Sequence, residues 1–395
     1  MKQNKILALV LVFLCVMAVS ACTRSNAMTG GSSWPGMTVN DDIVYAANGA
    51  YVEAVHNGQK LWRYPEDDKS RLSFYAAPTV DGAYVIVGTY DNQLHILNKE
   101  DGTLAASAAV GNNKNKIIAS PLVVDGKVYI ASSGGMVSSY TINVSGETLT
   151  PNWQTTLSSE VWVTPVYYEG TLYVASMDKK MNLLDAATGE LKESLPIGAV
   201  MDNMVLLDGK LYFSTLSKEV HEMDLATNEI RTVVTAEAEI WAAPLIMGDK
   251  MIVADMNGFV YCINMADSSV VWKTEKLTAE RTGFIASPIA LDEETILLID
   301  ESGNIMTYDT NGKSIGQRAL NQSVYTTPVI LSDGSFVSLP VSEDGQIKAY
   351  TADLKENYVY SRGTNSNTAA EPTAETANAE ATAEPTTEPT AAEAK

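Results

Sequence analysis

The sequence predicts an all-β fold built from eight repeats of about 42 residues, and three observations support this prediction. A proline that follows Ala, Ser or Thr recurs along the chain. Tight-turn dipeptides such as Asp-Gly separate short apolar runs. Between the two ends of the chain, no stretch shows a sustained helical apolar period. The repeats are therefore expected to consist of short antiparallel strands.

The recurring proline sets the length of the repeat. The dipeptides that define the repeat are Trp34-Pro35, Ala77-Pro78, Ser120-Pro121, Thr164-Pro165, Ala243-Pro244, Ser287-Pro288 and Thr327-Pro328, and Asn203-Met204 stands at the equivalent place where proline is missing. Their successive spacings are 43, 43, 44, 39, 40, 44 and 40 residues, which gives eight units.

Each unit contains three turn signals and therefore four strands. A first turn such as Asp125-Gly126 follows the proline and its apolar run, and a second turn is exemplified by Asn257-Gly258. A third turn such as Asn311-Gly312 precedes the fourth strand, which can end in tryptophan, as at Trp62 and Trp272. Asp-Gly between apolar runs indicates a hairpin, because both turn residues need a positive φ.

Four antiparallel strands cannot bury both faces of their sheet alone. A radial arrangement covers each sheet with its neighbours, whereas a long open meander would leave edges prone to aggregation. We therefore predict an eight-bladed β-propeller of four-stranded antiparallel blades over residues 34–362. No extra strand shared by the two ends is evident, so seven blades plus an irregular first unit is the alternative.

The N-terminus has the features of a lipoprotein export signal. Lys2 and Lys5 precede an apolar run, Ile6 to Ala21, whose 16 residues are fewer than the roughly 20 that span a bilayer. Val19-Ser20-Ala21-Cys22 resembles the bacterial lipobox, which implies a lipid on Cys22. We expect a signal peptide over 1–21 and an anchor linker over 22–33. The alternative is an ordinary signal peptide, or an uncleaved helix, that contains Cys22.

The C-terminal residues 363–395 are almost entirely Ala, Thr, Glu, Pro and Asn. Such a segment has too little apolar surface to offset its ordering entropy, so we expect a disordered acidic tail. A solvated spacer is the simplest interpretation, and a specific docking peptide is the alternative.

The repeat unit is similar to that of the quinoprotein-like (PQQ-like) propeller family. Its clearest copies are Asp125-Gly126-Lys127-Val128-Tyr129 and the segment from Leu184 to Leu191, and the resemblance extends from Trp34 to about Arg362. Combined with the lipobox, the chain resembles the propeller lipoproteins of the outer-membrane protein assembly machinery. The resemblance implies the fold strongly and the function only weakly, since a fold does not fix a function.

Charge and cysteine content exclude several classes of protein. The formal net charge of −21 argues against binding to nucleic acid, and also against electrostatic adhesion to anionic lipid. Cys15 lies in the signal and Cys22 would carry the lipid, so Cys262 is left without a disulfide partner in the folded part. We expect it to be a buried small apolar residue.

The sequence predicts no catalytic site, metal or cofactor. Quinone-dependent dehydrogenases share this repeat but carry an adjacent Cys-Cys pair near their cofactor, and this sequence has none. His56, His95 and His221 lie in separate units, so a metal site or triad would need a coincidence in space.

The predicted binding surface consists of the connections between units. In an up-and-down blade, the connection from strand four to the next strand one shares a face with the second turn, and variable loops commonly carry function. Three residues before the repeat prolines, or before Met204 where proline is missing, stand Tyr75, Ile118, Trp162, Met201, Trp241, Ile285 and Tyr325. With the cationic Arg71, Lys114, Lys116 and Arg281, the aromatic residues Tyr75, Trp162, Trp241 and Tyr325 form the predicted partner face. Packing of these aromatics between blades is the simpler alternative.

The function predicted from the sequence is a non-catalytic scaffold, monomeric and lipid-anchored, that binds protein partners at the cell envelope. The location would be the outer membrane if the host has one, and otherwise the outer face of the plasma membrane. A role in outer-membrane protein assembly is the specific form of this prediction. The alternatives are a surface module that binds carbohydrate or another ligand and, less favoured, a quinone-dependent dehydrogenase.

Overall fold

The computed structural model describes residues 35–67, 72–111, 115–143, 148–278, 282–342 and 344–362. The predicted signal peptide, Cys22 and the acidic tail lie outside these residues. In the described part of the chain, no helix is long and apolar enough to cross a membrane.

The described residues form thirty-two strands in eight sheets, and in each sheet four consecutive strands are antiparallel neighbours. Blade 1 contains β1 (Gly36–Asn40), β2 (Ile43–Asn48), β3 (Tyr51–His56) and β4 (Gln59–Tyr64). Blade 2 contains β5 (Thr79–Asp81), β6 (Tyr84–Gly88), β7 (Gln93–Asn98) and β8 (Leu104–Ala109). Blade 3 contains β9 (Leu122–Val124), β10 (Lys127–Ala131), β11 (Met136–Asn143) and β12 (Thr148–Thr156). Blade 4 contains β13 (Val166–Tyr168), β14 (Thr171–Ser176), β15 (Lys180–Asp185) and β16 (Leu191–Pro196).

The second half of the chain repeats this pattern. Blade 5 contains β17 (Val205–Leu207), β18 (Lys210–Ser214), β19 (Glu219–Asp224) and β20 (Ile230–Thr235). Blade 6 contains β21 (Leu245–Met247), β22 (Lys250–Ala254), β23 (Val260–Asn264) and β24 (Val270–Lys273). Blade 7 contains β25 (Ile289–Ala290), β26 (Thr295–Ile299), β27 (Asn304–Asp309) and β28 (Ser314–Ala319). Blade 8 contains β29 (Val329–Ile330), β30 (Phe336–Ser338), β31 (Ile347–Tyr350) and β32 (Glu356–Tyr360).

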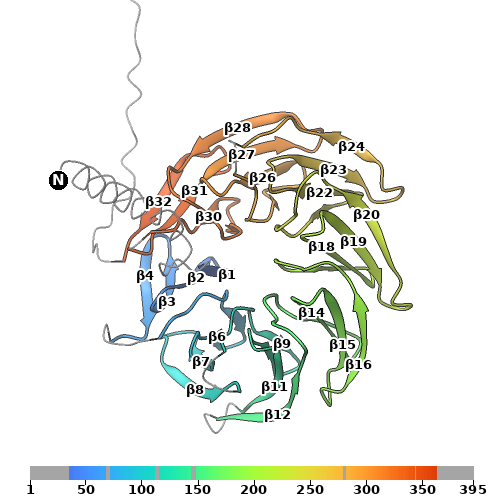
Figure 1. Cartoon of the computed structure of the whole chain (residues 1–395). Coiled ribbons are helices and arrows are strands. Elements are labelled where there is room, and N and C mark those ends of the chain that lie inside the picture. The colour runs from blue at the N-terminus through green and yellow to red at the C-terminus, as the bar shows by residue number, and fades with distance from the viewer. Residues whose placement is uncertain are drawn as a thin grey trace, which may run out of the picture.

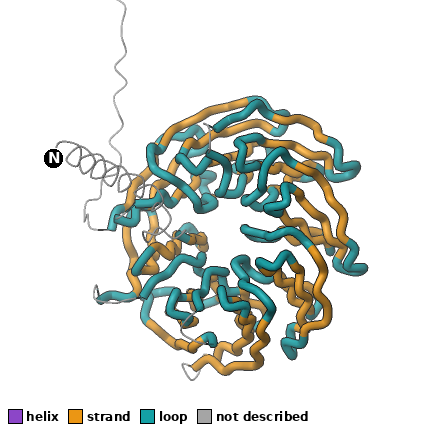
Figure 2. The backbone as a smooth tube through the Cα atoms, in the orientation of Figure 1, coloured by secondary structure: helices purple, strands orange, loops and turns teal. Residues whose placement is uncertain are grey.

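The blades follow one another around a ring, and the last blade lies beside the first (Figure 1). In the described residues the regular structure is strand throughout, connected by loops and turns (Figure 2). The eight-bladed prediction is confirmed. The seven-blade alternative is wrong, because the first unit forms a complete four-stranded sheet.

The core is divided among the seams between blades. At one seam, Tyr45 and Val52 of blade 1 pack with Val85 and Leu97 of blade 2, and similar buried clusters join the other neighbouring pairs. Each blade thus buries both faces of its sheet against its neighbours, which is the burial that one repeat cannot achieve alone. Cys262 belongs to such a cluster and is fully buried, as predicted.

The first turns have the geometry that Asp-Gly dipeptides require, with one correction. Asp125 and Gly126 have φ of 50° and 70°, between the paired residues Val124 and Lys127. At Asp81-Gly82 the prediction is wrong by one residue, because Asp81 still pairs with Tyr84 at the end of β5. The turn there is Gly82-Ala83, and glycine at its first position supplies the positive φ of 53°.

The third and fourth strands of blade 3 are the longest of the described strands, β11 with 8 residues and β12 with 9. Asn143 pairs with Thr148, so β11 and β12 extend into a longer hairpin than in the other blades. This hairpin brings β12 against β8, the outer strand of blade 2.

Tryptophans on the fourth strands join neighbouring blades. The indole Nε1 of Trp62 donates to the carbonyl of Lys99 in the next blade at 2.9 Å. Trp153 donates to Ala186 and Trp272 to Thr310, both at 3.0 Å. Their rings cover glycines of the third turns: a Cβ on Gly102 would lie 2.5 Å from the Trp62 ring. The tryptophan that marks the end of a repeat is therefore a clamp between blades.

The ring closes through side chains, since among the described strands none is shared by the first and last blades. Glu53 of blade 1 is 1% exposed and accepts hydrogen bonds from Tyr360 Oη at 2.8 Å and Arg362 Nε at 3.0 Å. In blade 8, Tyr358 stands at the strand position that tryptophan occupies in blades 1, 3 and 6, and its ring packs on Gly58 of blade 1. We call Glu53, Tyr360 and Arg362 the closure cluster.

Candidate partner-binding face

One face of the propeller is built from the connections between blades together with the second turns. The connection that enters blade 3 is bonded on both sides: Ile117 N donates to Thr89 O in blade 2 at 3.1 Å, and Ser133 N donates to Lys116 O at 2.8 Å. Thr89 and Ser133 both belong to second turns. The predicted sharing of one face is therefore confirmed, and we call this surface the loop face.

The same arrangement recurs around the ring. One residue of each connection is buried beneath the loop face, and six of the seven donate their backbone N–H to the second turn of the preceding blade at 2.7 to 3.3 Å. These buried anchors are Phe74, Ile117, Val161, Val200, Ile240, Phe284 and Val324. Because the backbone of the anchor residue is held in place, the residue that follows it occupies an equivalent position on the loop face in each blade.

The residues that follow the anchors are the seven positions that stand three residues before the repeat prolines, or before Met204, of which four are aromatic. Tyr75, Ile118, Trp162, Trp241, Ile285 and Tyr325 are half-buried, and Met201 is buried at 8% exposed. The aromatics therefore belong to blades 2, 4, 6 and 8, with aliphatic side chains between them. Their partial exposure leaves part of each ring accessible while the rest packs against the blades.

Two of the predicted residues are brought together through a third that the sequence analysis missed. The rings of Tyr75 and Tyr90 lie 4.4 Å apart between centroids, and Lys116 Nζ lies 4.8 Å from the centre of the Tyr90 ring. Tyr90 stands in a second turn, and its backbone N–H donates to Ser73 O at 2.9 Å. An aromatic residue immediately before the turn signal Asp91-Asn92 was the available signal for it.

The other predicted aromatic residues lie on other connections of the loop face. Trp162 Nε1 donates to Glu160 Oε2 at 2.7 Å on the same connection, which orients the indole. Trp241 and Tyr325 occupy the same register in blades 6 and 8. Three predicted cations, Arg71, Lys114 and Arg281, lie outside the described residues.

Both faces of the ring carry acidic and basic side chains. The opposite face, made of the first and third turns and here called the turn face, has an exposed carboxylate in or next to the first turn of each described blade. These are Asp41, Asp81, Asp125, Glu169, Asp208, Asp249, Asp292 and Asp333. The loop face has lysines among its acids, such as Lys180 paired with Asp178 at 2.8 Å.

Metal and triad chemistry have no visible support in the described part of the chain. No group of three or more His, Cys, Asp or Glu side chains there could hold a metal ion. His95 is buried in blade 2, where its Nδ1 lies 3.0 Å from Tyr64 Oη. His221 is buried in blade 5, and burial lowers the pKa of both imidazoles.

The buried imidazole of His95 predicts a loss of stability in acid. Burial lowers its pKa to about 4, against an ordinary value of 6.5, although Asp91 raises it slightly. The stabilising contribution is complete above pH 6.5 and is lost as the pH falls toward 4, because only the unfolded chain then binds the proton. We expect at most about 3 kcal/mol of loss from this group. Urea unfolding of His95→Gln beside the parent at pH 7.5, 6, 5 and 4.5 measures it. A stability difference between the two that does not change with pH would contradict the prediction.

Comparison with known proteins places this fold in a family. The family model described as outer membrane protein assembly factor BamB matches residues 48–199 and 193–393. A protein of that name from Yersinia pestis is 19% identical over 302 residues, 72% of each chain. Its counterpart from Xanthomonas campestris pv. campestris is 31% identical over 113 residues, and there the match spans about a quarter (26%) of the relative's length.

Solved structures show the same fold. The crystal structure of BamB from Moraxella catarrhalis matches with a TM-score of 0.63 at 16% identity, covering 84% of this chain and 95% of that one. A computationally designed protein, Ika8, matches with a TM-score of 0.64 at 14% identity, covering 81% of this chain and 96% of that one. The family model covers well over half of the chain and includes nearly all of its blades. The chain therefore belongs to the family of outer membrane protein assembly factor BamB, whose PQQ-like repeat it carries.

Proposed function

We propose that this chain is a lipid-anchored, non-catalytic scaffold that binds a protein partner at the cell envelope and acts in outer-membrane protein assembly. Family membership supports the assembly role, and the lipobox ending in Cys22 supports the anchor. The observation that carries the binding role is the loop face, where backbone hydrogen bonds fix an aromatic or aliphatic side chain of successive connections at one height.

The loop face suits protein recognition for physical reasons. Half-buried Tyr and Trp side chains offer large contact areas, and they lose little conformational entropy on binding because the connections already hold them. The group of Tyr75, Tyr90 and Lys116 adds a cation beside two aromatic rings. We therefore assign the main contacts with the partner to this group and to Trp162.

Site-specific photo-crosslinking in the native host tests the proposal. A benzophenone amino acid replaces Trp162 or Tyr75, and the protein is isolated through incorporated palmitate, which also tests the lipid on Cys22. We expect a crosslinked product that contains a component of the outer-membrane assembly machinery. The matched control replaces Leu206, which is 40% exposed in β17 near the first turn of blade 5, and should give at least tenfold less product.

Crosslinks to that machinery from Leu206 alone would assign binding to the turn face and contradict the proposal. Products that contain only surface polysaccharide would favour the carbohydrate-binding alternative.

A further inference from the structure

Among the described residues, seven of the eight seams between blades are bridged by a large or polar side chain at the outer strand. Four seams have an aromatic residue there: Trp62, Trp153, Trp272 and Tyr358. In two others a polar pair crosses the seam, Asn228 to Glu193 at 3.1 Å and Arg231 to Ser268 at 2.8 Å. Between blades 7 and 8, Leu354 packs beside Gly316 and its carbonyl accepts from Arg318 at 2.9 Å.

The seam between blades 2 and 3 differs from these. Ala106 pairs with Ile96 immediately before the bulge, which is the position that Trp62 occupies in blade 1 opposite Ala54. Tyr140 of blade 3 donates to Ala109 O at 3.0 Å and seals the seam near the loop face. Toward the turn face, no described side chain fills the place of the indole.

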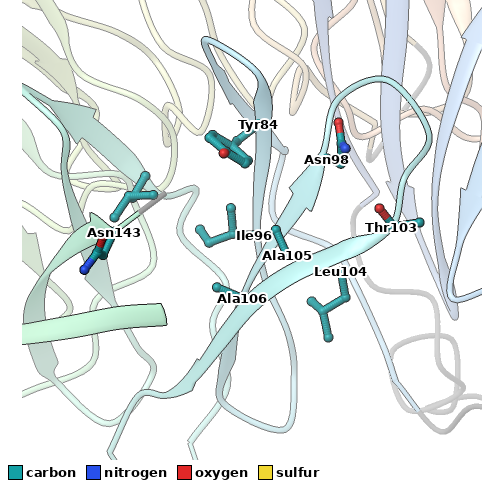
Figure 3. Close-up of a pocket in the computed structure, with 9 residues that line it drawn as sticks. Tyr84, Ile96, Asn98, Thr103, Leu104, Ala105, Ala106 and Asn143 are labelled. Atoms are coloured by element: carbon teal, nitrogen blue, oxygen red, sulfur yellow. The ribbon is translucent and has the colours of Figure 1, made fainter. Parts of the chain in front are cut away.

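A pocket of about 210 Å³ occupies this place (Figure 3). Its lining is mixed: Ile96, Leu104, Ala105, Ala106 and Ile142 are apolar, whereas Tyr84, Asn98, Thr103 and Asn143 add polar groups. It is smaller than the roughly 300–1,000 Å³ of drug-sized ligand sites. It is larger than the cavity of about 150 Å³ that holds benzene. Its size is that of one aromatic ring system.

The other seams indicate which ring system it fits. The carbonyls that accept from Trp62, Trp153 and Trp272 belong to residues whose own N–H donates to a first turn, as Ala186 N does to Gly170 O at 2.8 Å. In blade 3 the residue with that bond is Ile142, whose N–H donates to Gly126 O at 3.2 Å. Ile142 lines the pocket. The pocket is therefore lined by the residue equivalent to those whose carbonyls receive an indole N–H in three other seams.

We propose that this pocket binds an aromatic side chain, tryptophan in the first place, carried by a partner polypeptide. The rim supports a polypeptide as the source. Among the described strands only β7 pairs with β8, although β12 packs against it, and an extended peptide can add to the outer edge of such a strand. Leu104 at the mouth is 46% exposed and offers apolar contact for the residues beside the tryptophan.

This site is separate from the loop face, and its test does not depend on the proposed function. The probes are isolated compounds added to the purified full-length chain. Failure here would leave the envelope role untouched, and failure of the crosslinking above would leave this site untouched.

The first measurement titrates N-acetyl-tryptophanamide into the protein with ¹³C-labelled alanine and isoleucine methyl groups. We expect saturable shifts of the Ala106 and Ile142 methyl signals and no such shifts with N-acetyl-leucinamide at equal concentration. A heptapeptide with a central tryptophan between Thr and Val residues should reach half-saturation at a concentration at least tenfold lower. Equal affinity of the amide and the peptide would overturn the assignment to a polypeptide, and no shift with either would overturn the site.

The decisive variant is Ala106→Trp, which places an indole in the pocket from within the chain. It should abolish the shift of Ile142 on addition of either tryptophan probe, with an unfolding midpoint at or above that of the parent. The matched control is Glu193→Trp, at the same register of blade 4, which should leave the titration unchanged. Leu104→Asp changes an exposed residue at the mouth and should weaken binding at least tenfold, even if Ala106→Trp fails to fold. Retention of the Ile142 shifts in Leu104→Asp and in a folded Ala106→Trp would overturn the proposal.

Discussion

Replacement of Glu53 by alanine is expected to lower the free energy of unfolding by about 3–5 kcal/mol, because it leaves the largely buried guanidinium of Arg362 without its partner. The Glu53 carboxylate is 1% exposed and lies 2.9 Å from Arg362 Nη2, whose guanidinium also donates to the carbonyl of Asn48. Tyr360 donates its hydroxyl to the same carboxylate, and burial raises the pKa of this phenol, so it remains a donor. In the variant, both groups would be buried facing a small cavity.

The effect should be localised at the junction of blades 8 and 1. Hydrogen exchange followed by mass spectrometry should show faster exchange in β1 and β32, with β18 and β22 on the far side unchanged below the unfolding transition. Urea unfolding gives the total loss. Glu190→Ala is the matched control, since Glu190 pairs with Lys192 at 2.6 Å on the surface and should contribute less than about 1 kcal/mol. A loss for Glu53→Ala no larger than that of Glu190→Ala would show that the closure cluster does not hold the ring together.

Replacement of Trp62 by alanine is expected to cost about 3–5 kcal/mol, as large-to-small changes of buried aromatic residues do. Trp62 is 6% exposed, its ring covers Gly102 and lies 5.8 Å from that of Tyr45, and its N–H donates to Lys99 O. The substitution removes the ring contacts and the bond across the seam at once. The third turn of blade 2 would lose its cover.

Two variants separate these contributions in the same urea experiment. Trp62→Phe keeps an aromatic ring over Gly102 but loses the N–H donor, so it should cost less than Trp62→Ala. Leu61→Ala changes the neighbouring side chain, which is 50% exposed, and should change stability by about 0.5 kcal/mol or less. If Trp62→Ala cost no more stability than Leu61→Ala, the Trp62 side chain would not hold the two blades together, and the prediction would be wrong.

The binding surface inherits its geometry from these seams. Each connection on the loop face is bonded to the second turns of two blades, as Ile117 and Lys116 show. The relative position of Tyr75 in blade 2 and Trp162 in blade 4 therefore depends on how rigidly the blades between them are joined. A seam variant that loosens the ring should weaken partner binding without touching the loop face.

Most of the fold could be predicted from the sequence, because a hairpin is specified by residues close together in the chain. Asp125-Gly126 adopts the positive φ values that its two-residue turn requires, and short apolar runs flank the turn on both sides. The position of the aromatic register could be predicted for the same reason. The residues stand at a constant distance from the repeat proline, so equivalent backbones place Tyr75 and Trp162 at equivalent points.

The sequence by itself determined the repeat, the four-stranded unit and the face on which the connections lie. Only the tertiary structure decided how the ring closes and where a seam is left unfilled. Glu53 and Arg362 are separated by 309 residues, and neither belongs to a periodic pattern that would pair them. Ala106 is an ordinary strand residue until the indoles of other seams show what its position usually holds. Turn formation depends on local backbone preference, whereas seam packing depends on side chains that meet only after the blades are in place.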